Sequence, residues 1–360
     1  MQPRTIRKKC TAIDLFAGCG GVTHGLRKAG FEVLAAVEND PAAIRAFKLN
    51  HPSTEMFGDI ERVNLLSLKR KLRLRKGQLD LLAGCPPCQG FSSMSTRNGH
   101  WRVEDSRNSL INQFGTFVVE LLPKTVMLEN VPGLASERRF TKFVDRLTDL
   151  GYTLDYRIAN AADYGVPQRR KRLILVASRF GKVSFPLPTK KVNTVRDAIG
   201  ALPRAGSSGD ALHDLPERRT DKVQRLIKSI PRDGGSRGDL ALSEQLACHQ
   251  RTTGFNDVYG RMAWKSVSPT ITSGCFNPSK GRFLHPDEDR CITIREAALL
   301  QSFPANYALP VELGKQTLAL LIGNALPPEL ARRFALKIHK HLRANSTDVS
   351  SKKVQVLAVK

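Results

Sequence analysis

The sequence lacks long apolar segments. No run of 18 or more apolar residues occurs in its 360 residues, whereas a helix that crosses a bilayer needs about 20. The basic N-terminus, Met1 to Lys9, is not followed by the apolar core of a secretory signal. These absences argue against a membrane span and against secretion, so we expect a cytoplasmic protein.

A paired set of cysteines is also missing. The chain has 7 cysteines, an odd number, so a disulfide framework is not expected in a chain of this length. Cys85 and Cys88 form a C-x-x-C pair, but no second closely spaced pair completes a zinc site. The two prolines between them differ from common redox motifs. No metal site is predicted, and a zinc or redox role for this pair is left as the alternative.

Acidic residues are scarce. The chain has 33 Asp and Glu against 57 Lys and Arg, a formal net charge of +24. An excess of this size favours a polyanionic partner, most simply nucleic acid. The alternative is charge that only keeps the protein soluble. Charge alone does not indicate which nucleic acid is bound.

Short apolar runs alternate with helical patterns over the first 180 residues. Strands are expected at 12–16, 31–37, 78–83, 125–128 and 173–177. One helix is expected over 22–29, before Gly30, and another begins at Pro41, a residue that suits the first helical position. This alternation predicts a mainly parallel, doubly wound α/β sheet with helices on both faces.

The pattern changes near Lys182. Residues 182–260 are rich in Gly, Pro, Ser, Arg and Asp, with a short helix expected only at 221–230. Regular pattern returns at 293–301, and a C-terminal helix is expected over 328–342, followed by a frayed segment at 345–360. The change predicts a second, smaller and irregular domain.

Glycines follow the first expected strand directly. The segment AGCGG, residues 17–21, allows the backbone to approach a ligand, and the next helix offers unpaired N–H groups. Glu38 ends the second strand at the spacing where Rossmann-like folds bind ribose hydroxyls, and Asp59 follows later. A tight turn with a helix-capping acid is the alternative. The pattern G-x-G-G, rather than G-x-G-x-x-G, argues against a nicotinamide dehydrogenase.

A reactive segment, LLAGCPPCQGFS at 81–92, places the Cys88 thiol at the carboxyl edge of the expected sheet, where such folds bind ligands. A free cysteine has a pKa of roughly 8.5, so a nearby cation or helix terminus would increase its thiolate fraction. Residues 93–105 suit a loop that closes over a substrate. Glu129 ends another strand, and residues 165–172 bring several cations to the start of the next.

These segments, taken in order, resemble the motif series of the DNA cytosine-5 methyltransferases of bacterial type, which use S-adenosylmethionine. The segments are DLFAGCGG, END, GDI, GCPPCQGFS, SRNSL, ENV, VPQRRKR and GKQTLALLIGNALPP. The resemblance covers nearly all of residues 11–340 except the irregular middle. Each motif is weak alone, and the series is specific. It implies a Rossmann-like doubly wound methyltransferase sheet with a second, smaller target-recognition domain.

The resemblance implies a covalent mechanism on a flipped cytosine. Cys88 would attack C6 of the base, and Glu129 would hold N3 and the exocyclic amine. Arg170 would contact the base carbonyl, and Arg172 would support Glu129 and the cysteine loop. Gln89 and Ser92 are also implied as catalytic, on the loop that follows the base.

A cofactor pocket for S-adenosylmethionine, with S-adenosylhomocysteine as the product, follows from the same resemblance. The implied pocket residues are Asp14, Phe16, Ala17, Gly18, Gly20, Gly21, Glu38, Asn39, Asp59, Ile60, Pro87, Leu110, Asn324 and Ala325. The chain departs from the family where Asn39 replaces a frequent aromatic and Ala325 a frequent serine, which puts adenine stacking and one hydrogen bond in doubt. No role is assigned to Cys85.

The implied domains are a discontinuous catalytic domain (1–185 and 312–343), a small target-recognition domain with its hinge (186–311) and a tail (344–360). Residues implied to bind DNA are Gln168, Arg251, Thr252, Thr253, Arg261, Thr270 and Thr272. For the group at 251–253 a polar surface loop is the alternative. The basic run 69–76 is interpreted as the solvated face of a peripheral helix rather than as a DNA contact.

The implied activity is that of a DNA (cytosine-5-)-methyltransferase (EC 2.1.1.37). The expected partner is double-stranded DNA, with no membrane partner, for a monomer of the bacterial cytoplasm or nucleoid. The enzyme would act alone or beside a cognate restriction endonuclease that acts separately. A transfer RNA cytosine-5 methyltransferase and a catalytically silent DNA-binding protein are the rivals. An amino-methyltransferase would need Asn/Asp-Pro-Pro-aromatic, whereas Pro86-Pro87 leads into a cysteine.

Overall fold

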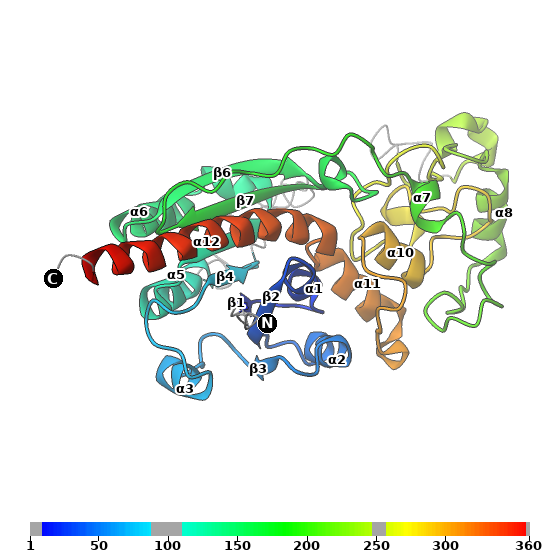
Figure 1. The fold of residues 1–360 in the computed structure, drawn as a ribbon. Helices are drawn as coiled ribbons and strands as arrows, with labels where there is room; N and C mark the ends of the chain where they lie inside the picture. Colours follow the sequence, from blue (N-terminus) through cyan, green and yellow to red (C-terminus); the bar gives the residue numbers. More distant parts are fainter. Residues whose placement is uncertain (1–8, 88–109, 247–256, 358–360) are drawn as a thin grey trace, which may run out of the picture.

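The computed structural model describes residues 9–87, 110–246 and 257–357, with the backbone alone for 346–357 and for Leu242. A seven-stranded sheet is the centre of its larger part (Figure 1). The strand order is β3-β2-β1-β4-β5-β7-β6. The strands are β1 (Cys10–Leu15), β2 (Phe31–Val37), β3 (Glu55–Phe57), β4 (Leu81–Gly84), β5 (Thr125–Asn130), β6 (Thr153–Asn160) and β7 (Lys171–Ser178).

The sheet is parallel from β3 to β5, and β7 runs antiparallel to both β5 and β6. Because parallel strands end at the same edge, residues that follow β1, β4 and β5 meet there. β4 and β5 are buried along their whole length, which explains their continuous apolar sequences. The predicted mainly parallel, doubly wound sheet is confirmed.

Helices cover both faces of the sheet. On one face, side chains such as Ala12, Leu81 and Ile174 pack with α1 (Gly21–Lys28) and α12 (Pro328–Leu357). On the other face, Ile13 and Leu82 pack with α5 (Leu110–Leu121) and α6 (Arg138–Asp149), beside α3 (Leu65–Lys71). The helix α2 (Pro41–Asn50) begins at Pro41 as predicted, and the Asp40 side chain accepts from the N–H groups of Ala42 and Ala43.

Residues 186–311, here called the small region, lie beyond one end of the sheet (Figure 1). They contain α7 (Val195–Ile199), α8 (Asp221–Ser229) and α10 (Ile294–Leu300), and much of the rest is irregular. Their main core includes Trp264 and Phe283, and it is shared with Ala43 of α2 and Leu318 of α11 (Gly314–Asn324). The two parts therefore meet through a common apolar core, and α11 packs with the small region although the sequence grouped it with the sheet.

Several expectations on single elements were wrong. The strand β6 was missed, because Tyr156 and Ile158 are exposed at the edge of the sheet and its apolar pattern is broken. The expected frayed segment at 345–360 is helical up to Leu357, since no Gly or Pro interrupts the chain after Pro328. Within the described residues, no helix is long and apolar enough to cross a membrane.

Candidate active site

The turn after β1 has an unusual backbone. Phe16, Gly18 and Gly20 have φ angles of 57°, 54° and 97°, in the left-handed region that favours glycine. The Ala17 N–H donates to Val37 O and the Gly20 N–H to Ala17 O, which fixes the turn on the end of β2. A Cβ atom on Gly21 would lie 2.6 Å from Leu326 O and 3.5 Å from the Ala325 Cβ. The segment between α11 and α12 therefore lies against this turn.

Glu38 follows β2 and faces this turn. Its Oε2 accepts from the Gly18 N–H at 2.8 Å, and its Oε1 accepts from the N–H groups of Asn39 (2.9 Å) and Asp40 (3.0 Å). A carboxylate offers about four acceptor positions. Glu38 therefore organises the turn and keeps acceptor capacity for a ligand hydroxyl.

Asp14, near the end of β1, is fully buried. The Thr23 hydroxyl donates to its Oδ2 at 2.7 Å, whereas its Oδ1 has no partner among the described residues. Burial raises the pKa of this carboxyl to about 7, against the lowering effect of the Thr23 hydrogen bond. An unpartnered buried acid beneath a glycine turn is an arrangement that fits a polar ligand group.

The other implied cofactor residues also lie at strand or helix ends. Asp59 follows β3 and accepts from the Glu61 N–H at 3.1 Å, and Ile60 beside it is buried. Asn39 is exposed after β2. Pro87 and Leu110 are partly buried on either side of the segment 88–109, and Asn324 is exposed at the end of α11.

Glu129 lies in β5 near its carboxyl end and is 6% exposed. Arg172 of β7 pairs with it, with 2.9 Å between the Arg172 Nε and the Glu129 Oε1. This is the partner that the resemblance assigned to Arg172. The next residue, Asn130, donates from Nδ2 to Pro86 O at 2.8 Å and accepts from the Val131 N–H. The segment that leads to Cys88 is thus tied to the end of β5.

Cys85 lies beside Glu129. Burial raises the pKa of its thiol well above the ordinary value, and the negative charge of Glu129, that of Asp14 and a hydrogen bond to Glu129 raise it further. Such a thiol stays protonated and can donate. No role was predicted for Cys85, and its environment is that of a neutral neighbour of the carboxylate rather than of a nucleophile.

Arg170 is 2% exposed, and the partners of its guanidinium are backbone carbonyls. Its Nη1 donates to Ile271 O at 3.1 Å and its Nη2 to Gly323 O at 2.9 Å, while its Nε has no partner among the described residues. Burial and the charge of Arg172 lower the pKa of this guanidinium to about 9. Arg170 therefore links β7 to the small region and α11, and its contact with a base carbonyl stays a prediction.

Two residues implied to bind DNA are interior. Gln168 is fully buried: its Nε2 donates to Gln301 Oε1 and Leu300 O, and its Oε1 accepts from the Ile271 N–H. Arg261 is also fully buried and is bonded throughout its guanidinium. These placements do not support direct DNA contact and indicate a framework role instead.

The remaining predicted residues are placed only in part. The Thr270 hydroxyl donates to Arg169 O and the Thr272 hydroxyl accepts from the Gly274 N–H, so both stabilise the segment next to Ile271. Five predicted site residues, Gln89 and Ser92 with Arg251, Thr252 and Thr253, lie outside the described residues, as does Cys88.

The sequence missed Asn130, Tyr307 and His51. Asn130 belongs to the quoted segment ENV, so its motif was an available signal. Tyr307 and His51 lie beneath the glycine turn, and no local pattern pointed to either. In the part of the basic run 69–76 that is helical, Lys69 pairs with Glu120 and Lys71 with Glu55.

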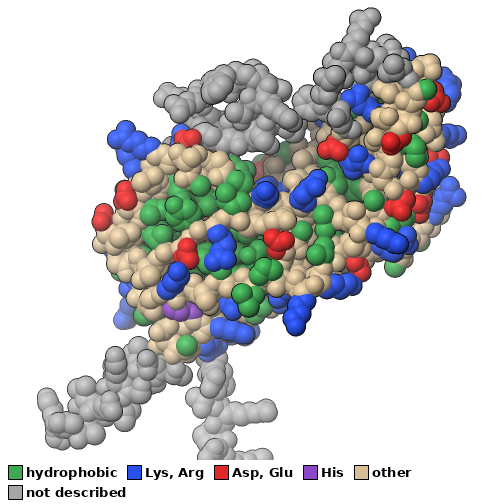
Figure 2. All heavy atoms as spheres, turned by 90° about the horizontal axis from the view of Figure 1, so that it is seen from above, with side chains coloured by type: hydrophobic (Ala, Val, Ile, Leu, Met, Phe, Trp, Pro, Cys, Tyr) green, Lys and Arg blue, Asp and Glu red, His purple; other side chains and the backbone are tan. Residues whose placement is uncertain are grey.

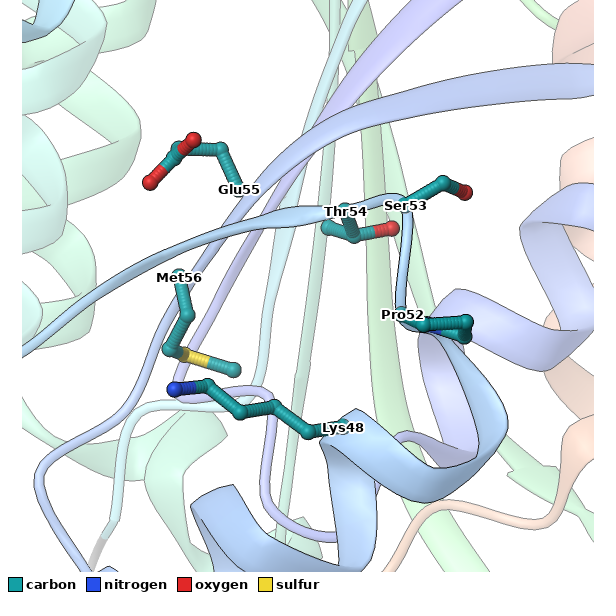
Figure 3. Close-up of a pocket in the computed structure, with 6 residues that line it drawn as sticks. All are labelled: Lys48, Pro52, Ser53, Thr54, Glu55 and Met56. Atoms are coloured by element: carbon teal, nitrogen blue, oxygen red, sulfur yellow. The ribbon is translucent and has the colours of Figure 1, made fainter.

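Two surface features lie apart from this site. A cavity of about 370 Å³ near the start of β3 is lined by residues 48 and 52–56, and none of them is a predicted site residue (Figure 3). On the face in Figure 2, Lys and Arg side chains are spread out with Asp and Glu among them. The described residues of that face do not form one continuous basic strip.

Comparison with known proteins identifies the family. The profile described as C-5 cytosine-specific DNA methylase matches residues 10–340. The Type II methylase M.HgiDII of Herpetosiphon aurantiacus is 36% identical over 344 residues, which cover 92% of this chain and 95% of that protein. The Type II methyltransferase M.XorII of Xanthomonas oryzae is 35% identical over 371 residues, covering 92% and 85%.

Solved structures agree with the sequence relatives. A DNA modification methyltransferase encoded within an Escherichia coli prophage superposes with a TM-score of 0.68 at 26% identity, covering 93% of this chain and 99% of that one. In this chain, the glycine turn, the buried Glu129 and its partner Arg172 lie at one edge of the sheet. The family profile spans both parts of the molecule. The chain therefore belongs to the C-5 cytosine-specific DNA methylase family and is a DNA (cytosine-5-)-methyltransferase.

Proposed function

We propose that the chain methylates C5 of a cytosine that has left the stack of a specific double-stranded DNA sequence, with S-adenosylmethionine as the methyl donor and Cys88 as the nucleophile. One observation carries the proposal: the buried Glu129 is paired with Arg172, and the adjacent Asn130 side chain holds Pro86 O. A carboxylate and the segment leading to the thiol therefore share one edge of the sheet.

The base would be activated at this edge. Cys88 Sγ forms a bond to C6, which moves electron density to C5. Glu129 accepts a hydrogen bond from the exocyclic amine and passes a proton to N3, where negative charge develops, while Arg172 holds the carboxyl group through Oε1. Once C5 has gained the methyl group, the C5 proton is lost to water, the C6–S bond breaks and the thiolate is released. The base must leave the duplex for these contacts to form.

The residues of the glycine turn fit the proposed cofactor. When bound, S-adenosylmethionine supplies an electrophilic methyl group on its sulfonium. Glu38 keeps acceptor capacity for ribose hydroxyls, and the unpartnered Oδ1 of Asp14 lies beneath the same turn. Asp59 and Ile60 would bind the adenine end. Asn324 and Ala325 would close the pocket from the segment before α12.

The small region would recognise the DNA sequence. Its described part supplies a rigid frame around Arg261, and the predicted recognition residues 251–253 would read bases from that frame. We propose that Gln168 and Arg170 hold the frame against the sheet, because their side chains end on Leu300, Gln301, Ile271 and Gly323. Arg170 would reach the base carbonyl through its unbonded Nε or by exchanging one of these bonds. The catalytic domain would comprise 1–185 and 312–343 and act as a monomer.

The test begins with the recognition sequence. Bisulfite sequencing of DNA from cells that express the chain identifies the methylated cytosine. A duplex with 5-fluorocytosine at that position should then form a covalent complex in the presence of cofactor, because fluorine cannot leave as a proton. Cys88→Ser should form no complex and should keep its cofactor affinity. A wild-type enzyme that methylates the plain duplex but leaves the fluorinated one free would contradict attack at C6.

The same purified enzyme also distinguishes the alternative functions. Labelled methyl groups should enter duplex DNA and not transfer RNA; the reverse result would favour the RNA enzyme, and no transfer to either would favour a silent binding protein. The Type II relatives suggest a modification enzyme whose endonuclease acts separately. DNA from the expressing cells should then resist a nuclease that cuts the same recognition sequence when it is unmethylated.

A further inference from the structure

Tyr307, from the small region, reaches the glycine turn that follows β1. It lies between α10 and α11 and is 2% exposed. Its hydroxyl donates to Cys19 O at 2.5 Å, across 288 positions of sequence. The ring of Phe303 packs on it with 4.7 Å between ring centroids, which holds the tyrosine in place. Tyr307, which is not among the predicted cofactor residues, therefore donates a hydrogen bond to the backbone of the glycine turn that contains several of them.

His51 completes this contact from the end of α2. Its Nε2 lies 3.3 Å from the Tyr307 hydroxyl oxygen. The single hydroxyl proton is engaged by Cys19 O, so the imidazole must be the donor, with its proton on Nε2. Burial, with the positive charges of Arg27 and His24, lowers the pKa of His51 to about 4, so the ring is neutral near pH 7. His51 thus donates to Tyr307, which donates to Cys19.

Gly20 lies directly against these two side chains. With φ at 97°, it has the left-handed backbone of the turn. A Cβ atom there would lie 2.7 Å from the Tyr307 hydroxyl oxygen and 2.7 Å from the His51 Cδ2. Real Cβ atoms do not approach other atoms so closely. The two side chains therefore form a floor against which the turn rests at Gly20.

Further contacts anchor this floor. Asn50, next to His51, donates from Nδ2 to Ala308 O at 2.8 Å and accepts from the Ala308 N–H at 2.9 Å. Arg45 of α2 pairs with Glu312. The segment 307–312 is thereby fixed on α2 at both ends. Tyr307 and His51 are therefore both held against the turn, so the position of Cys19 O depends on both.

We propose that Tyr307 and His51 are positioning residues for the cofactor: together they hold Cys19 O and Gly20 in the conformation that binds S-adenosylmethionine. The inference rests on the proposed use of that cofactor. Neither residue touches the base or the reacting thiol. Loss of the hydroxyl releases Cys19 O, the turn gains alternative conformations, and cofactor binding must then select the competent one. The cofactor Kd and its KM rise, while kcat at saturating cofactor and the KM for DNA do not.

A matched pair of variants tests this. Tyr307→Phe removes the hydroxyl on the turn. Tyr152→Phe removes another buried hydroxyl, which donates to Pro123 O beside β5 and far from the turn. Both variants lose a hydrogen bond to a backbone carbonyl, so both should lower the melting temperature by similar amounts. Only Tyr307→Phe should raise the Kd for S-adenosylmethionine, about tenfold, in isothermal titration calorimetry.

A second pair examines His51. His51→Gln places an amide N–H near the position of Nε2, and His51→Leu does not. We expect the glutamine variant to keep a cofactor Kd within about threefold of wild type and the leucine variant to match Tyr307→Phe. If Tyr307→Phe and Tyr152→Phe change the cofactor Kd equally, or if both His51 variants do, the inference is overturned and the proposed function is left intact. A wild-type chain that does not bind the cofactor would overturn both.

Discussion

The two parts of the molecule each bury an arginine, and they hold it differently. Arg261, in the small region, donates to Ile230 O, Ile227 O, His285 O and Glu288 O and pairs with Asp289 at 2.6 Å. Arg170, at the sheet edge, has two carbonyl partners, no acid partner among the described residues and an unbonded Nε.

The difference distinguishes an arginine with a structural role from one at a functional site. Desolvating a guanidinium is costly unless its donors are satisfied. Arg261 satisfies this condition, so it is a structural centre. Among the described residues, Arg170 Nε and Asp14 Oδ1 are buried without partners, and the thiol pKa of Cys85 is raised. These three groups lie near the edge where the β1, β4 and β5 strands end, as expected of a site that is completed by ligands.

The largest effect is expected at Glu129. Glu129→Gln keeps the shape of the side chain and removes its charge, so kcat should fall about 10²- to 10⁴-fold, the usual contribution of such a group. The melting temperature should change little, because Arg172 keeps an amide oxygen to bond. The control is Glu120→Gln, which removes the carboxylate that pairs with Lys69 on the surface. A loss of less than tenfold in Glu129→Gln would remove this carboxylate from the chemistry.

The two arginines can be compared directly. Arg261→Met leaves four carbonyls without their donor and leaves Asp289 with Arg232 alone among the described residues, and it should lower the free energy of unfolding by about 3–5 kcal/mol. Arg170→Met also removes a poorly compensated buried charge, so it should cost only about 1 kcal/mol while reducing turnover. Urea unfolding of both variants measures this. Equal costs would mean that Arg170 is as well satisfied in solution as Arg261.

The sequence predicted the elements whose side chains are buried or locally capped. The strands β1, β2 and β7 carry apolar runs, and Asp40-Pro41 marks the start of α2 by local chemistry. It did not predict that Gln168 and Arg261 are interior. Polar residues are mostly exposed, and here burial depends on partners such as Gln301, 133 positions away. For the same reason Tyr307, bonded across 288 positions, gave no local signal.

Asp14 gives the effect that has a defined pH window. The pKa of its carboxyl is raised from 3.8 to about 7 in the folded chain. A raised carboxyl pKa favours the folded state at low pH, and this contribution is lost as pH rises from about 3.8 to 7. Asp14→Asn lacks this titration, so its stability relative to wild type should increase over that range, by at most about 4 kcal/mol. Its cofactor affinity should fall.

The variant Thr23→Val tests which contacts set the pKa of Asp14. The Thr23 hydroxyl is the group that lowers the pKa of Asp14 most, so its removal should move the upper end of the window above pH 7. Urea unfolding of the three proteins between pH 4 and pH 8 follows these changes. A stability difference between Asp14→Asn and wild type that is constant over this range would mean that the carboxyl does not titrate there. The unpartnered Oδ1 would then have a partner in solution, and the contrast with Arg261 would rest on Arg170 alone.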